Sequence, residues 1–309
     1  MAMKKNLINI PPHILDCKED FIKIDFFCIG VAKCGSTWLA QCLDEHPHIT
    51  IAKGKEPNFF VKKLTVFDNA INDNFLRSWK WYRSFFCHAP PNNKLGDCSI
   101  HLFHNIPEAP MLIKYFYPNA KLILILRDPV KRLYSNFWFE KLYNNVRGVP
   151  DTFEDALHNK EFLYRSKYYA QLIQWLRFFP ITQFFIITDI ELSTNLKKVI
   201  QNLFSFIGVD KNFIPPSLNI KINESCKAGW PRLLGLKIAK FLRARGLDKV
   251  VDSLNNMGVR DLINKISIRK ISYPPMDSNT EIYLRNYFLS DIEQLEVLTG
   301  KDLTRWKTI

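Results

Sequence analysis

The chain has 309 residues, of which 47% are hydrophobic and 14% aromatic, so it is long enough and apolar enough to bury a substantial core. Its formal net charge of +13 favours anionic ligands, but the lysines and arginines are spread along the sequence instead of forming a block. No apolar run is long enough to span a bilayer, and the N-terminus lacks the pattern of a secretory signal. These features predict a cytoplasmic protein with no membrane partner.

The cysteines and histidines do not form a pattern typical of a metal site or a disulfide framework. The seven cysteines are scattered and contain no CxxC pair, as is typical of reduced thiols in the cytosol. His101 and His104 form an HxxH pair with no second group of ligands, so no metal ion is expected. Homeodomain, zinc-finger and RGG-type patterns are also absent, so nucleic acid is not an expected partner.

The order of apolar segments predicts an α/β fold. Strands that are apolar on both faces, as in a covered parallel sheet, are expected at residues 25–30, 121–127 and 184–188. Helical patterns are expected at residues 36–46, 129–143, 168–179, 193–208 and 278–298. Ser193 is the predicted N-cap of the helix that ends at Gly208. The alternation predicts a three-layer α/β fold with a central parallel sheet in one domain over residues 1–309, with a less regular, partly helical excursion at about 220–275.

The segment GVAKCGSTW, between the first strand and the first helix, has the composition of an anion-binding loop. The helix should begin near Ser36 and Thr37, where free backbone N–H groups and the positive end of the helix dipole favour an anion. Lys33 adds a full charge, and the two hydroxyl groups add donors. In a Walker loop the lysine directly follows the last glycine, whereas Lys33 precedes Gly35. The alternative is a plain strand–turn–helix corner with a surface lysine.

A second anion-binding pattern follows the strand at residues 121–127. Arg127 lies at the carboxyl end of this strand, where open α/β sheets bind their ligands, and Ser135 follows about two helical turns later. A guanidinium and a hydroxyl in these positions fit a second phosphate, which an arginine can bind with two hydrogen bonds. The alternative is that the Arg–Asp pair before Pro129 only caps the next helix.

Together, GVAKCGSTWL and LRDPVKRLYS resemble the 5′-phosphosulfate and 3′-phosphate motifs of sulfotransferases that use 3′-phosphoadenosine 5′-phosphosulfate (PAPS). The resemblance is to the heparan sulfate, carbohydrate and bacterial branch. It continues over nearly the whole chain, through HPHITIAKGKEPNFF, YYAQLIQWLRFFP, NLFSFIGV and YPPMDSNTEIYLRNYFLSDIEQLEVLTGKDLTRW. It implies the three-layer, P-loop-like sulfotransferase fold, PAPS as cofactor, 3′-phosphoadenosine 5′-phosphate (PAP) as product, and no need for a metal ion.

The resemblance also implies roles for individual residues. Lys33 would stabilise the charge that develops on the leaving phosphate oxygen, and Glu56 would be the general base. The alternative for Glu56 is a surface glutamate between two lysines. The implied cofactor-binding residues are Lys33, Cys34, Gly35, Ser36, Thr37, Trp38, Arg127, Ser135, Lys227, Arg269 and Lys270. The implied acceptor-binding residues are Glu56, Ser99, His101 and Tyr168. Stacking on the adenine is assigned to Trp38, Tyr168 or Trp230, with core packing as the alternative for each.

One departure from the family pattern bears on the acceptor. Relatives often have an acidic–Lys–Ser/Thr–Pro segment at the acceptor site, whereas this chain has Asp97-Cys98-Ser99-Ile100. The missing lysine argues against a polyanionic sugar. The expected acceptor is therefore an oxygen or nitrogen of a small molecule. Within the family, the chain most resembles bacterial natural-product enzymes such as those that sulfate guanidinium alkaloids of the saxitoxin type, and this resemblance implies a role in natural-product tailoring. A carbohydrate sulfotransferase, a P-loop kinase and a basic nucleic-acid-binding protein are the alternatives.

Overall fold

The computed structural model describes residues 12–15, 20–144, 146, 148–220, 226–228, 268–270 and 273–308. The chain divides into two compact units. The larger comprises Met1–Phe137, Val146–Ile222 and Met276–Ile309, and the smaller comprises Trp138–Asn145 and Asn223–Pro275. The single domain expected over residues 1–309 stays a prediction.

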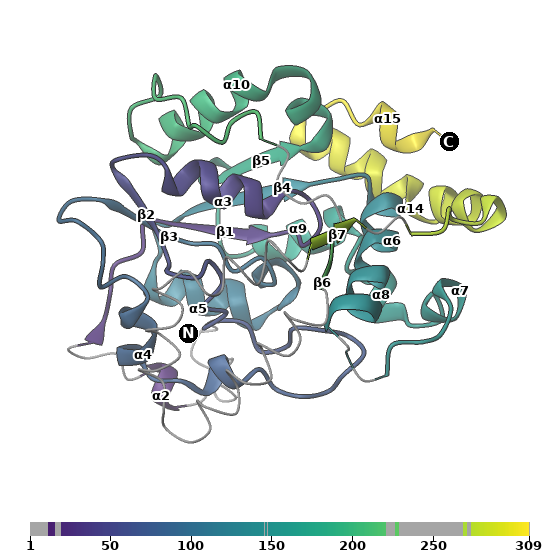
Figure 1. The fold of residues 1–309 in the computed structure, drawn as a ribbon, viewed down its shortest axis with the longest axis horizontal. Helices are drawn as coiled ribbons and strands as arrows, with labels where there is room; N and C mark the ends of the chain where they lie inside the picture. The colour runs from purple at the N-terminus through teal and green to yellow at the C-terminus, as the bar shows by residue number, and fades with distance from the viewer. Residues whose placement is uncertain are drawn as a thin grey trace. The chain divides into compact units, whose positions relative to one another are not determined.

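The larger unit is built on a five-stranded parallel sheet with the strand order β2-β3-β1-β4-β5 (Figure 1). The strands are β1 (Phe26–Gly30), β2 (Ile49–Ile51), β3 (Lys94–Asp97), β4 (Lys121–Leu126) and β5 (Phe184–Thr188). The predictions of β1, β4 and β5 are confirmed. Every residue of β1 is buried, and so are all residues of β4 after Lys121, as their continuous apolar sequences require.

Helices cover both faces of this sheet. In Figure 1, α3 (Ser36–Asp44) and α10 (Asp189–Ile207) lie over one face, and α5 (Glu108–Phe116) lies over the other. The longer helices that follow the predicted patterns are α6 (Pro129–Phe139), α9 (Tyr168–Leu176) and α14 (Ser278–Thr299). The shorter ones are α2 (Pro12–Leu15), η3 (Asp73–Leu76), α4 (Trp79–Ser84), η4 (Leu102–His104), η5 (Glu140–Asn144), α7 (Phe153–Ala156), α8 (Lys160–Tyr164), η6 (Ile181–Gln183) and α15 (Thr304–Lys307).

The start of α10 differs from the prediction. The N-cap is Thr188, whose hydroxyl accepts a hydrogen bond from the backbone N–H of Glu191, and the Glu191 carboxylate accepts one from the Thr188 backbone in return. This capping box satisfies two backbone donors at once, and the N-cap lies five residues before the predicted one. α10 has a kink at Asn195, whose φ of −142° and ψ of 44° are not helical, and Ser193 lies in the helical segment before this kink, where it donates to the carbonyl of Ile190. The predicted end is confirmed, because Gly208 forms the C-cap in a left-handed conformation, with φ of 92°.

A buried ion pair holds the C-terminal helices against the end of β4. Arg285 of α14 donates to Asp128 Oδ2 at 2.8 Å, and both side chains are about 5% exposed or less. Arg285 also donates to the carbonyl of Trp306 at 2.8 Å. The other oxygen of Asp128 accepts from the backbone N–H of Val130 and thus caps α6. The aspartate of the LRDP segment therefore pairs with Arg285. The alternative in which Arg127 and Asp128 act together as a helix cap is not favoured by this pairing.

The smaller unit contains a two-stranded antiparallel ribbon of β6 (Cys226–Ala228) and β7 (Ile268–Lys270). In the same unit, the rings of Trp138 and Tyr273 stack with their centroids 5.9 Å apart. Most of the excursion predicted at about 220–275 lies outside the described residues.

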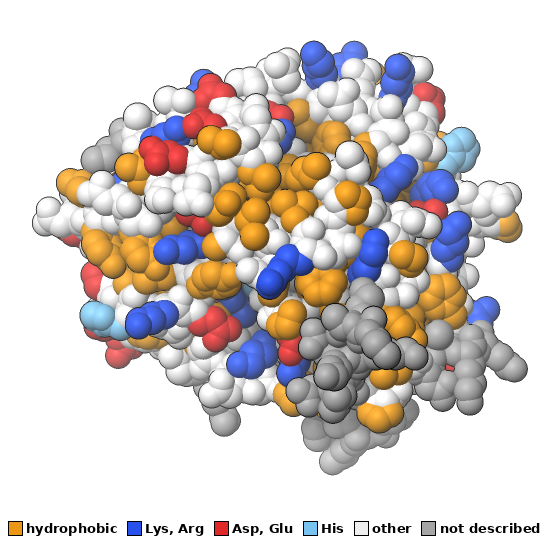
Figure 2. Space-filling view, turned by 180° about the vertical axis from the view of Figure 1, so that it is seen from behind, with side chains coloured by type: hydrophobic (Ala, Val, Ile, Leu, Met, Phe, Trp, Pro, Cys, Tyr) orange, Lys and Arg blue, Asp and Glu red, His pale blue; other side chains and the backbone are white. Residues whose placement is uncertain are grey.

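One face of the molecule shows how the charged side chains are distributed. On the face shown in Figure 2, lysine and arginine side chains lie among hydrophobic and acidic ones, without forming a continuous stripe across the described residues. Among the described helices, none combines the length and the hydrophobicity needed to cross a membrane.

Candidate active site

The loop that follows β1 occupies the centre of the sheet's carboxyl edge. Because β1 lies between β3 and β4, the chain leaves it where the strand order reverses, which is the usual ligand site of open α/β sheets. Two loop residues, Lys33 and Gly35, adopt left-handed backbone conformations, with φ of 71° and 93°. Glycine does so freely, but a lysine is strained there, and such strain is concentrated at functional sites.

The first turn of α3 is open to an anion. Gly35 is the N-cap and provides no side-chain hydrogen bond, and the first turn contains no acidic residue. By contrast, α10 and α14 begin with capping side chains, Thr188 and Asp277. The first backbone N–H groups of a helix have no intrahelical acceptor, so an uncapped start presents donors and the positive dipole end to a ligand.

Two arginines from the second motif contact this loop. Arg127 Nη1 donates to the carbonyl of Lys33 at 3.4 Å, across 94 residues of sequence. Arg132 is 1% exposed, and its Nε donates to the carbonyl of Ala32 at 3.2 Å. The guanidinium charges offset the negative ends of these loop peptides. The structure therefore brings the two predicted anion-binding motifs together. Arg132 was not among the predicted site residues, although it lies within the quoted LRDPVKRLYS segment.

Glu56 is joined to the loop through Lys55. The Lys55 ammonium donates to Ser36 Oγ at 3.3 Å, to Thr37 Oγ1 at 3.2 Å and to Glu56 Oε1 at 2.8 Å. The predicted base therefore lies beside the predicted phosphosulfate loop and is not an isolated surface glutamate. Lys55 was not predicted as a site residue, because a lysine in a turn sequence such as KGKE is usually a solvent-exposed charge.

The segment after β3 is held by a buried carboxyl group. Tyr82 donates to Asp97 Oδ2 at 2.8 Å, and Ser99 donates to Asp97 Oδ1 at 2.5 Å. Burial raises the pKa of Asp97 from 3.8 to about 6, although the hydrogen bonds from Ser99 and Tyr82 act to lower it. The Ser99 hydroxyl also accepts from the backbone N–H of Asn58. Ser99 was predicted to bind the acceptor, but its hydroxyl is fully buried within this cluster.

His101 lies within electrostatic reach of Glu56. Burial lowers the pKa of His101 from 6.5 to about 4, while the Glu56 carboxylate acts in the opposite direction, so the imidazole is neutral near pH 7. Its Nδ1 atom is buried and has no hydrogen-bond partner among the described residues. His104, by contrast, contacts Gln171 Oε1 at 2.6 Å and Arg132 Nη2 at 3.4 Å. In the described parts of the chain, no three His, Cys, Asp or Glu side chains are grouped as for a metal ion.

Two other predicted residues, Tyr168 and Cys34, are buried beside the loop and the end of β4. Tyr168 is 1% exposed, donates to the carbonyl of Arg127 at 2.9 Å and packs on Trp306. It therefore supports the chain just after β4, whereas it was predicted to bind the acceptor. Burial raises the pKa of the Cys34 thiol to about 12, so this loop residue stays neutral.

The remaining predicted residues are Trp38, Ser135, the basic residues of the ribbon and Trp230. Trp38 is 7% exposed, and its Nε1 donates to the carbonyls of Ser217 and Leu218, which favours the packing alternative over adenine stacking. Ser135 lies on the buried face of α6. Lys227, Arg269 and Lys270 lie in the β6–β7 ribbon, in which Lys227 is paired with Arg269 and Cys226 with Lys270. Trp230 lies outside the described residues.

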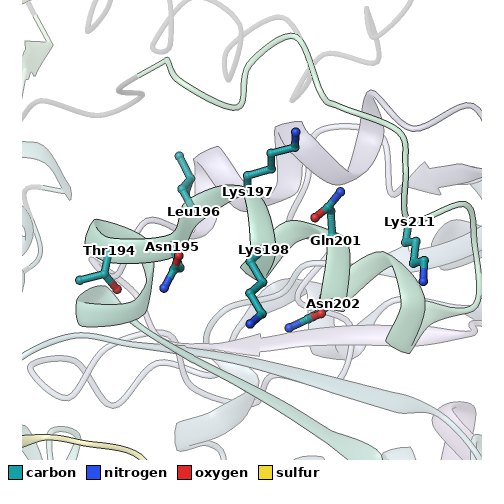
Figure 3. Close-up of a pocket in the computed structure, with 8 residues that line it drawn as sticks. All are labelled: Thr194, Asn195, Leu196, Lys197, Lys198, Gln201, Asn202 and Lys211. Atoms are coloured by element: carbon teal, nitrogen blue, oxygen red, sulfur yellow. The ribbon is translucent and has the colours of Figure 1, made fainter.

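A surface hollow of about 680 Å³ lies elsewhere, on α10. It is lined by exposed and half-buried residues of that helix, 194–198, Gln201 and Asn202, together with Lys211. Figure 3 shows that the Lys197 side chain points away from those of Lys198 and Lys211, so the three ammonium groups do not converge. The hollow contains none of the predicted site residues.

Comparison with known proteins agrees with this geometry. Residues 23–226 match the family model of the sulfotransferase domain. The chain belongs to the sulfotransferase family. A crystal structure of a sulfotransferase from Alicyclobacillus acidocaldarius superposes with a TM-score of 0.65 at 20% identity, over 93% of this chain and 100% of the other. The three-layer, P-loop-like sulfotransferase fold is thereby confirmed.

Curated sulfotransferase relatives are larger proteins that act on heparan sulfate, as their names say. The human bifunctional heparan sulfate N-deacetylase/N-sulfotransferase 3 is 27% identical over 301 residues, which cover 91% of this chain and 31% of the relative. The human heparan sulfate glucosamine 3-O-sulfotransferase 6 is 27% identical over 201 residues, covering 60% of this chain and 54% of the relative. The sulfotransferase chain thus spans about a third of the length of the first relative.

Proposed function

We propose that this chain transfers the sulfo group of PAPS to an oxygen or nitrogen atom of a small-molecule acceptor. The observation that carries the proposal is the convergence of the two anion-binding motifs, with Arg127 hydrogen-bonded to the carbonyl of Lys33 at 3.4 Å. PAPS is anionic at both its 5′ and 3′ ends, and two neighbouring anion sites of this kind suit such a ligand.

The residues present fit PAPS. The uncapped start of α3, the backbone of Cys34 and Gly35, and the hydroxyl groups of Ser36 and Thr37 provide donors for the 5′ end. Arg127 and Ser135 are assigned to the 3′-phosphate, since a guanidinium can bind phosphate with two parallel hydrogen bonds. We also assign Lys227, Arg269 and Lys270 of the ribbon to the cofactor, on the family resemblance alone.

When bound, PAPS supplies a sulfo group attached to a phosphate leaving group. Glu56 takes the proton from the acceptor's hydroxyl or amine as that atom bonds to sulfur and the bond from sulfur to the phosphate oxygen breaks. Lys33 stabilises the negative charge left on the phosphate oxygen. Because the Lys33 ammonium supplies the positive charge beside the leaving phosphate oxygen, we expect turnover without an added metal ion.

The acceptor side favours a small molecule that is not strongly anionic. Lys55, which lies beside Glu56, is already paired with it at 2.8 Å, and His101 is neutral near pH 7. The neighbouring segment has Cys98 and the buried Asp97–Ser99 pair where a lysine would attract an anionic sugar. We therefore expect a natural-product acceptor, for example one with a guanidinium group.

A carbohydrate acceptor is the second candidate. It is favoured by the heparan sulfate sulfotransferases, which align with 91% of this chain. The two candidates predict different products in one screen. The chain is incubated with PAPS and an alcohol, a phenol, an amine, a guanidine or a desulfated oligosaccharide, and mass spectrometry detects the addition of one sulfo group. Sulfation of the small acceptors supports the proposal, and sulfation of the oligosaccharide alone would replace it.

The Glu56→Gln variant tests the assignment of the base. Glutamine keeps the size and a carbonyl partner for Lys55 but cannot accept a proton. PAP affinity should stay within about twofold of wild type, and turnover at neutral pH should fall by about 10²–10⁴-fold. Activity should partly recover at high pH, where the acceptor loses its proton without help. Near-wild-type turnover across pH would place the base elsewhere, and His101 would be tested next.

A further inference from the structure

The Lys55 ammonium lies between the two halves of the proposed site. An ammonium has three N–H donors, and those of Lys55 contact three acceptors: Ser36 Oγ, Thr37 Oγ1 and Glu56 Oε1. The lysine and glutamate side chains are 19% and 26% exposed. This partial exclusion of water makes the contacts stronger than those of a pair on the open surface.

These contacts determine what the two hydroxyl groups can do. A serine or threonine hydroxyl has one hydrogen to donate and two lone pairs that accept. When Ser36 and Thr37 accept from Lys55, their own hydrogens are directed away from the ammonium and are available to an anion at the start of α3. A hydroxyl that accepts from a cation is also polarised and becomes a better donor.

The backbone at Lys55 is held in an unusual conformation. Its φ is 79°, in the left-handed region that lysine rarely adopts, and the preceding Gly54 has a φ of 83°. The Lys55 backbone N–H donates to the carbonyl of Ala52 at 2.8 Å, which closes this turn. Lys33 and Lys55 are thus two strained lysines in one site, and such strain is maintained where the surroundings require a particular side-chain position.

Lys55 also supplies positive charge to a segment that lacks its own. The Asp97–Ile100 segment contains no basic residue. Burial and the neighbouring Cys28 raise the pKa of the Cys98 thiol, and the charge of Lys55 acts in the opposite direction.

We propose that Lys55 couples the cofactor loop to the base: it orients Ser36 and Thr37 as donors to the 5′-phosphosulfate group, and it positions Glu56 for the acceptor's proton. This inference rests on the proposed function. It assigns a positioning role to a residue of the turn after β2, separate from the role of Lys33 in the loop.

The first test measures PAP binding by titration calorimetry. Lys55→Met should weaken PAP binding by about 10- to 100-fold, the scale of one charge-assisted hydrogen bond. Lys55→Gly removes the same ammonium while relieving the left-handed backbone, so it should fold at least as stably as wild type and still lose the affinity. The matched control is Lys53→Met, which removes an exposed lysine from the same turn and should bind PAP within twofold of wild type.

The second test is a double-mutant cycle in turnover, followed as PAP formed from PAPS with the best acceptor of the screen, or with water in its place. If Lys55 acts on proton transfer through Glu56, Lys55→Met should lower kcat in wild type but hardly lower it further in Glu56→Gln. Its effect on PAP affinity should persist in both backgrounds. If Lys55→Met instead damages the fold, it should lower kcat by the same factor in wild type and in Glu56→Gln, and it should likewise lower PAP affinity by the same factor in the two proteins.

The outcomes separate the two proposals. If wild type fails to bind PAP, the proposed function is wrong. If wild type binds PAP, but Lys55→Met and Lys55→Gly bind it within twofold of wild type, the inference about Lys55 alone is overturned. The inference is also overturned if the double variant loses kcat by the product of the two single-variant factors, because Lys55 and Glu56 then act independently.

Discussion

The buried carboxyl group of Asp97 should make the stability of the protein fall as pH rises from about 4 to about 6. The side chain is fully buried, and burial raises its pKa from 3.8 to about 6. Between these values the unfolded chain releases the proton while the folded chain keeps it, so the folded state binds more protons and loses stability with rising pH. At about 1.36 kcal/mol for each unit of pKa, the loss is about 3 kcal/mol in the free energy of unfolding.

The comparison that isolates this effect is Asp97→Asn, which is neutral at every pH. The asparagine amide cannot accept from both Tyr82 and Ser99, so the variant carries a constant penalty of about 1 kcal/mol for one lost hydrogen bond. The informative quantity is the difference in unfolding free energy between wild type and Asp97→Asn, measured by urea titration from pH 4 to pH 8. This difference should move by about 3 kcal/mol in favour of the variant as pH rises and level off above about pH 6.5.

A second variant, Tyr82→Phe, provides an internal check on the same residue. It removes a donor that stabilises the charged carboxylate, so the pH-dependent loss should become larger and extend to higher pH. If the difference between wild type and Asp97→Asn stays flat within about 0.5 kcal/mol over this range, the pKa of Asp97 is not raised by folding, because the carboxyl group then titrates alike in the folded and unfolded chains.

Other variants test the proposed cofactor site and the buried ion pair between Arg285 and Asp128. Lys33→Ala should lower turnover by about 10²–10³-fold and PAP affinity much less, and an unchanged kcat at saturating PAPS would remove Lys33 from the mechanism. Arg127→Ala should weaken PAP binding by about 2–4 kcal/mol but leave binding of adenosine 5′-phosphosulfate nearly unchanged, and equal losses in calorimetry would mean a structural role. Arg285→Leu should cost about 3–5 kcal/mol in thermal or urea unfolding, because it leaves Asp128 charged and buried, and Asp128→Asn in the same chain should restore part of the loss.

The sequence was informative wherever one local pattern determined the structure. The continuous apolar segments of β1, β4 and β5 gave correct strands, since only a covered parallel sheet accommodates such segments in an α/β fold. The strands β2 and β3 could not be predicted, because β2 has three residues and β3 reads KLGD, with two residues that disfavour strands. Ser193 was a plausible N-cap, but the reciprocal pair of Thr188 and Glu191 stabilises an earlier start.

The candidate site was only partly predictable, because some of its residues belong to local motifs and others are defined by tertiary contacts. Lys33 and Arg127 belong to motifs whose spacing is visible in the chain, and the structure brings their two segments together. The roles of Arg132 and Lys55 depend on contacts with other segments, since Arg132 contacts Ala32, 100 residues before it, and Lys55 contacts Ser36, 19 residues before it. Tyr168 was assigned to the acceptor from its place in a family-like segment, but its direction is set by packing against Trp306. No local pattern carries this information.

The central claim is that the loop after β1 and the start of α6 together bind a nucleotide with anionic groups at its 5′ and 3′ ends. Titration calorimetry of wild type with PAP in the presence of EDTA tests it most directly, with adenosine 5′-phosphate, ATP and a random oligonucleotide as comparison ligands. We expect micromolar binding of PAP without Mg²⁺, and binding of adenosine 5′-phosphate weaker by about 2–4 kcal/mol, the contribution assigned to the 3′-phosphate. Equal affinity for PAP and adenosine 5′-phosphate, or binding of ATP only with Mg²⁺, would contradict it.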